Sequence, residues 1–62
     1  MDRERAIELL PEAYRRALHL QEQGAGDEEV AQHLGIPLEA ISSLFQIAQA
    51  KLAELLAGDR EV

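Results

Sequence analysis

Residues 33–52, HLGIPLEAISSLFQIAQAKL, decide the fold of this chain. Gly35 predicts a turn, because glycine adopts a positive φ without steric cost. After it, apolar residues recur at helical spacing: Ile41, Leu44, Phe45, Ala48, Leu52, Leu55 and Leu56. A short helix, a glycine turn and a long second helix together are typical of a helix-turn-helix. Such second helices usually enter a DNA groove, yet this one has no Lys or Arg before Lys51.

The length and charge of the chain limit what it can be. Its 62 residues predict a single domain, 1–62, and a chain this short buries only about 60% of its unfolded surface. Twelve acidic residues against six Lys plus Arg give a formal charge of −6, which repels polyanions such as DNA. No stretch is long and apolar enough to predict a membrane span, and the charged N-terminus does not resemble a signal peptide. We therefore expect a cytoplasmic protein.

The composition favours helix throughout, because Ala, Leu, Glu, Gln and Arg are abundant while β-branched and aromatic residues are scarce. Proline and glycine mark the boundaries: Pro11, Gly24, Gly26, Gly35, Pro37 and Gly58. Pro is favoured in the first turn of a helix and Gly just after the last. The sequence therefore predicts a small all-α fold of four helices with a core of three, at about residues 2–9, 11–23, 27–34 and 37–57.

The helix-turn-helix prediction depends on several residue types in one order. The first helix needs a small residue where the two helices cross, and Ala31 is suitable. Gly35 follows four positions later, and Ile36 is the apolar residue that fills the angle after the turn. We expect these scaffold residues: Val30, Ala31, Leu34, Gly35, Ile36, Ile41 and Phe45.

The stretch from Leu10 to Leu56 resembles region four of bacterial sigma factors, especially the small extracytoplasmic-function type. LPEAYRRALHL resembles the Leu-Pro opening of that family, and DEEVAQHLGIP resembles its Glu-Glu-Ile-Ala-x-x-Leu-Gly-Ile-Ser segment. AISSLFQIAQAKLAELL resembles its recognition helix, usually written Thr-Val-Lys-Ser-Arg-Leu-x-Arg-Ala-Arg-x-x-Leu. The resemblance implies a four-helix domain that, in the family, binds the −35 promoter element and docks on RNA polymerase.

The departures from the family pattern fall on its DNA-contacting positions. The family's Lys corresponds here to Ser42 and its next Arg to Leu44, and the later basic positions correspond to Ile47, Gln49 and Ala50. Glu39 and Ala40 replace the Gly-Thr that starts the family's recognition helix. The scaffold positions match and the basic contacts do not.

Charge favours protein over DNA as the partner. No Lys or Arg lies between Ala17 and Ala50, where five acidic residues occur, so the phosphate neutralisation that supports DNA affinity is missing. Ser42, Ser43 and Gln46 can hydrogen-bond to base edges, but base contacts also need positioning contacts to phosphates. We expect a protein-interaction face made of Leu38, Glu39, Ser42, Ser43, Leu44, Gln46 and Ile47.

Several alternatives stay open. The apolar members of that face can instead belong to a wide core stripe, in which Leu38 and Ile47 are only partly exposed. The predicted partners are RNA polymerase, a sigma or anti-sigma protein, or a second copy of the chain. A DNA-binding regulator, acting as a dimer or inside a larger complex that supplies basic contacts, is the competing hypothesis. A fragment or relic that retains only its fold is the third.

The remaining polar residues do not indicate catalysis. Arg3, Arg5, Arg15 and Arg16 alternate with acids, so we interpret them as solvated pairs at helical spacing. His19 and His33 are isolated, and the chain has no Cys. Ser42-Ser43 has no base to activate it, so we expect no enzyme activity, no cofactor and no metal.

Overall fold

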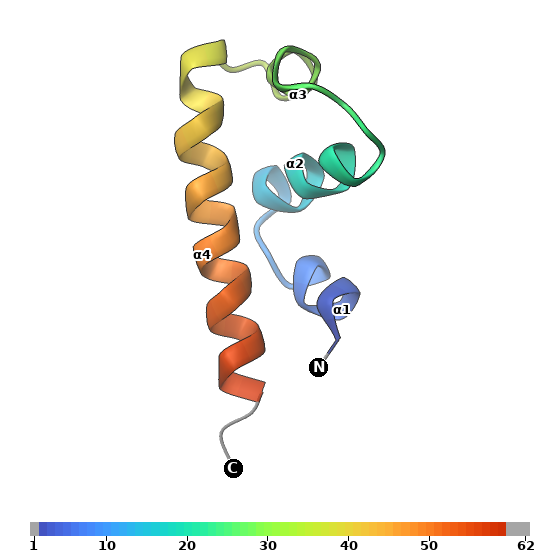
Figure 1. Cartoon of the computed structure of the whole chain (residues 1–62), viewed down its shortest axis with the longest axis vertical. Helices are drawn as coiled ribbons and strands as arrows, with labels where there is room; N and C mark the ends of the chain where they lie inside the picture. Colours follow the sequence, from blue (N-terminus) through green and yellow to red (C-terminus); the bar gives the residue numbers. More distant parts are fainter. Residues whose placement is uncertain (1, 60–62) are drawn as a thin grey trace.

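The computed structural model describes residues 2–59, and within this part the chain is all-α, as the sequence predicts (Figure 1). Its elements are α1 (Arg3–Glu8), α2 (Glu12–Glu22), α3 (Asp27–Leu34), the short 3₁₀ helix η1 (Leu38–Ala40) and α4 (Ile41–Asp59). Positions 1 and 60–62 of the predicted domain lie outside the described residues.

The first helix, α1, is capped by Asp2, whose carboxylate accepts the backbone N–H of Arg5 at 2.8 Å. This contact satisfies one of the N–H groups that a helix start leaves without a partner. Ala6 and Ile7 are fully buried. Six residues are too few to display a clear helical period, so the sequence does not indicate that α1 contributes to the core.

Both α2 and α3 end in the same way, on a glycine with positive φ. At the end of α2, Gly24 has φ 92°, and the N–H of Ala25 donates to the carbonyl of Leu20 at 3.0 Å. At the end of α3, Gly35 has φ 69°. The Ala25 bond satisfies a carbonyl that α2 itself leaves without a partner. The positive φ of each glycine turns the chain sharply towards the next helix.

The predicted fourth helix, 37–57, needs a correction at its start. Pro37 has φ −64° and ψ 148°, so it is extended rather than helical. The chain then makes one tight turn, η1, closed by the N–H of Ala40 donating to the carbonyl of Pro37 at 3.0 Å. Regular α-helix begins only at Ile41 and continues to Asp59, past Gly58.

The core consists of two clusters along one side of α4. The first, here called the N-terminal cluster, contains Ala6, Ile7, Leu10, Leu18, Ala48 and Leu52. The second, here called the turn cluster, contains Ala17, Val30, Ala31 and Ile41. Phe45 is half-buried and packs against both clusters. Figure 1 shows α1, α2 and α3 following one another along the same side of α4, which explains why a single helix contributes to both.

The basic residues near the N-terminus are arranged only partly as expected. Arg16 pairs with Glu12 one turn earlier, at 3.9 Å. Arg3 instead forms an ion pair with Glu22, so it links the start of α1 to the end of α2. Short-range spacing does not indicate this pair, because it depends on how the two helices pack.

None of the described helices is both long and apolar enough to cross a membrane.

Candidate interaction face

The turn before α4 is held by backbone hydrogen bonds around Gly35. The N–H of Ile36 donates to the carbonyl of Ala31 at 3.1 Å, and the N–H of Gly35 donates to that of Gln32 at 3.3 Å. Ile36 packs against the turn cluster, beside Val30 and Ala31. The predicted scaffold residues thus lie together, and the turn fixes where α4 begins.

The structure places most of the predicted interaction face in solvent. Leu38 and Ile47 are 47% and 44% exposed, which is unusual for large aliphatic side chains. The polar members are also exposed: Glu39, Ser42, Ser43 and Gln46. Leu44 differs, because it is half-buried against the turn cluster. Leu44 therefore belongs to the edge of the core, and the remaining six residues face solvent.

The two exposed aliphatic side chains of this face, Leu38 and Ile47, lie on different elements, η1 and α4. Leu38 lies beside α3, in an open hollow of about 430 Å³ that Glu28 and Gln32 also line. Ile47 lies in α4, six residues after the start of that helix, which corresponds to about 9 Å along its axis. The hollow beside Leu38 does not include Ile47.

Ser42 and Gln46 lie one helical turn apart on the side of α4 that faces the α2–α3 connection. They line a hollow of about 520 Å³ together with Gln21, Asp27, Phe45 and Gln49. Gln21 and Asp27 are absent from the predicted face, because the sequence does not show which part of α2 and α3 lies beside α4. The hollow offers amide, hydroxyl and carboxylate groups, with the Phe45 ring as its apolar part.

The charges around the start of α4 are negative. Asp27 lies in the hollow with Ser42 and Gln46, and Glu28 lies in the hollow with Leu38. The first cation of α4 is Lys51, whose Nζ lies 5.9 Å from the centre of the Tyr14 ring, well along the helix from Ser42. The two hollows at the start of α4 are therefore lined by carboxylates and by no Lys or Arg.

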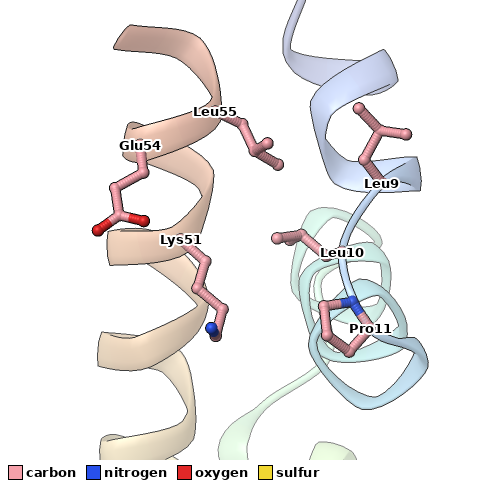
Figure 2. A pocket seen from close by; sticks show the side chains of 6 residues that line it. All are labelled: Leu9, Leu10, Pro11, Lys51, Glu54 and Leu55. Atoms are coloured by element: carbon pink, nitrogen blue, oxygen red, sulfur yellow. The ribbon is translucent and has the colours of Figure 1, made fainter. Parts of the chain in front are cut away.

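A further hollow lies at the other end of α4 and includes a residue that the sequence does not single out. Leu9 is 56% exposed, and it lines a hollow of about 350 Å³ with Leu10, Pro11, Lys51, Glu54 and Leu55. Figure 2 shows Leu10 and Leu55 pointing towards one another across it, while the Glu54 carboxylate points away from the α1–α2 connection. Leu9 lies between the buried residues Ile7 and Leu10. Its exposure depends on where α1 ends, because the chain leaves the helix at Leu9.

Within residues 2–58, no group of three or more His, Asp or Glu side chains is arranged to hold a metal ion. Comparison of the chain with protein-family models, with curated proteins and with solved structures gives no match.

Proposed function

We propose that this chain is a transcription-associated interaction module, similar to region four of sigma factors, that binds a protein through η1 and the first half of α4. The observation that carries the proposal is the combination of exposed Leu38 and Ile47 with the absence of Lys and Arg from Ala17 to Ala50. Exposed aliphatic side chains favour contact with protein. The missing cations remove the largest general contribution to DNA affinity.

The charges also indicate what kind of partner surface would fit. Asp27, Glu28 and Glu39 surround the start of α4. A complementary partner would offer an apolar pocket for Leu38, bordered by Lys or Arg, because paired potentials steer association and exclude other partners. RNA polymerase, a sigma factor or an anti-sigma factor is the predicted partner class. A role with any of them places the protein in the cytoplasm.

The direct test is binding to purified bacterial RNA polymerase core enzyme, a purified sigma factor and a purified anti-sigma factor, measured by surface plasmon resonance. We expect Leu38→Asn to weaken binding to the true partner at least about tenfold, which corresponds to about 1.4 kcal/mol. Leu9→Asn is the matched control, because Leu9 is at least as exposed as Leu38 but lies at the other end of the molecule. Absence of binding to all three proteins, or equal losses for both variants, would contradict the proposal.

DNA binding is the competing function, and one observation favours it. The second helix of the helix-turn-helix exposes Ser42, Ser43 and Gln46, whose side chains can hydrogen-bond to base edges. In that case, a dimer or larger complex would supply the phosphate contacts. Fluorescence anisotropy with promoter-like and mixed-sequence duplexes at low salt separates the two functions. We expect no affinity tighter than about 10⁻⁴ M, and a salt-sensitive micromolar complex would establish DNA binding instead.

A further inference from the structure

The hollow beside the α2–α3 connection carries five polar side chains and one aromatic ring. Three helices contribute them: Gln21 of α2, Asp27 of α3, and Ser42, Phe45, Gln46 and Gln49 of α4. The four residues of α4 follow one another in steps of one, three and four, so they lie along one side of the helix. The hollow measures about 520 Å³ and is open to solvent. Its shape therefore suits a side chain that reaches in from another molecule.

The polar side chains of this hollow are available to a ligand. Within residues 2–59, none of the five forms a side-chain hydrogen bond or an ion pair with another residue. All five are exposed, and the Asp27 carboxylate and the amide oxygens are hydrogen-bond acceptors. Phe45 is half-buried, so the core holds its ring in place while part of it lines the hollow. The hollow thus combines a fixed apolar surface with free acceptors.

The charge around the hollow is negative. Residues 17–50 include five acids and no Lys or Arg. Three of these acids lie in the first turn of α3: Asp27, Glu28 and Glu29. The start of a helix carries only about half a positive charge, so the three carboxylates outweigh it. Arg3 reaches the end of α2, but it is paired there with Glu22. The hollow therefore favours a cationic group and disfavours an anionic one.

We propose that this hollow binds the guanidinium group of an arginine side chain on a partner protein. A guanidinium is planar and always charged, it donates several hydrogen bonds at once, and it stacks on aromatic rings. Asp27 would accept its charge-assisted hydrogen bonds, Phe45 would provide the ring, and the glutamine amide oxygens would accept the remaining donors. A lysine ammonium fits less well, because it is a compact, strongly hydrated charge with no flat face to stack.

The arginine site goes beyond the proposed function, which rests on two other side chains. Leu38 lines a different hollow, and Ile47 lines neither of the two. A DNA base edge is another ligand that hydroxyl and amide groups can bind. However, a base edge offers no positive charge to Asp27, and it comes with phosphates that the surrounding carboxylates repel. The charge of the hollow therefore favours arginine over DNA.

A single arginine should bind this hollow weakly. Both the ion pair with Asp27 and the contact with the Phe45 ring would remain partly in water, where such interactions contribute little. We expect a dissociation constant on the order of 10⁻² M for an isolated arginine. On a partner protein the arginine would be one contact among several, and its charge would orient the partner more than it would tighten the complex.

Proton NMR of the full chain tests the site directly, because Phe45 is its only Phe, Tyr14 is its only Tyr, and it has no Trp. The probe is N-acetyl-arginine amide, raised to about 0.1 M at constant ionic strength. We expect saturable shifts of the Phe45 ring signals, with nuclear Overhauser contacts to the side-chain methylenes of the probe, while the Tyr14 signals stay in place. N-acetyl-lysine amide should cause smaller shifts. N-acetyl-citrulline amide, which has the same shape without the charge, should cause none.

Two variants with the same loss of charge test the role of the carboxylate. Asp27→Asn removes the carboxylate of the hollow, whereas Glu29→Gln removes one from the same helix turn that does not line it. We expect Asp27→Asn to weaken binding of the arginine probe about fivefold and Glu29→Gln to change it little. Leu38→Asn should have no effect, which keeps this test distinct from that of the proposed function. Equal shifts with the citrulline probe, equal losses for Asp27→Asn and Glu29→Gln, or Phe45 signals that do not move would overturn the proposal.

Discussion

The backbone N–H of Ile36 donates to the carbonyl of Ala31 at 3.1 Å, and this bond fixes the angle between α3 and the helix that follows. It closes around Gly35, whose φ of 69° is in the left-handed region. An equivalent bond ends α2 around Gly24, where the N–H of Ala25 donates to the carbonyl of Leu20. Gly24 and Gly35 therefore set the directions in which the chain leaves α2 and α3.

Replacement of Gly35 by alanine should destabilise the fold through its backbone. The left-handed conformation costs a residue with a Cβ about 1–2 kcal/mol, and no neighbour lies within 4 Å to add a clash. Urea unfolding followed by circular dichroism measures the loss. Gly58→Ala is the control, because Gly58 is helical and equally uncrowded, so alanine should be neutral or stabilising there. Equal losses for both variants would show that the turn is not strained.

Two isoleucines of α4 should differ sharply in their contribution to stability. Ile41 is completely buried in the turn cluster, whereas Ile47 is 44% exposed. We expect Ile41→Ala to cost about 2–5 kcal/mol, which is most of the roughly 3–9 kcal/mol available to a domain of this size. Ile47→Ala should cost less than about 1 kcal/mol, measured at low protein concentration. Similar costs would mean that α4 packs on a different side.

Burial rather than ion pairing should hold α1 in place. The Arg3 and Glu22 side chains that link α1 to α2 are 48% and 34% exposed, and pairs of this kind contribute about 0–1 kcal/mol. Arg3→Ala should therefore have little effect on thermal unfolding. Ile7→Ala, which empties a fully buried site on the same helix, should cost about 2–5 kcal/mol. A larger loss for Arg3→Ala than for Ile7→Ala would reverse this ranking.

Addition of cations to the exposed side of α4 should increase the affinity of the protein for DNA. Ser42, Gln46 and Gln49 are exposed and lie on one side of the helix, so their replacement by Lys creates a basic row. We expect the slope of log K against log salt to become steeper by about 2–3, close to 0.9 per phosphate neutralised. Fluorescence anisotropy at several salt concentrations measures this slope.

A charge-matched variant tests whether position matters in that experiment. Lys at Ala13, Gln23 and Ala57 changes the net charge equally, but these exposed residues are dispersed over α2, the α2–α3 connection and the end of α4. We expect a smaller gain in affinity, because dispersed cations cannot follow a phosphate backbone together. Equal gains would show that net charge alone limits DNA binding.

Most of the fold follows from local features of the sequence. Gly35 and Ile36 predict the turn, and the spacing of Ile41, Ala48 and Leu52 predicts the buried side of α4. These features depend on backbone sterics and on the period of a helix, which neighbouring residues determine. The start of α4 is less predictable, because Pro37 is compatible with a helix start and with the extended conformation that it adopts here.

The candidate site is predicted only in part. The sequence indicates that Leu38 and Ile47 exceed what one buried stripe can hold, and both are exposed. It does not indicate that Leu38 lies beside Glu28, or that Ser42 shares a hollow with Asp27. Those relationships join residues of different helices, so they depend on how the helices pack.

By itself, the sequence determined the helical class, the glycine turn and the absence of cations from the predicted DNA-contacting positions, since each is a property of composition or local spacing. Only the tertiary structure decided that Leu44 belongs to the core edge and that Leu9 is exposed. The physical reason is burial. A side chain loses contact with water only when another element covers it, and that cover comes from residues distant in the chain.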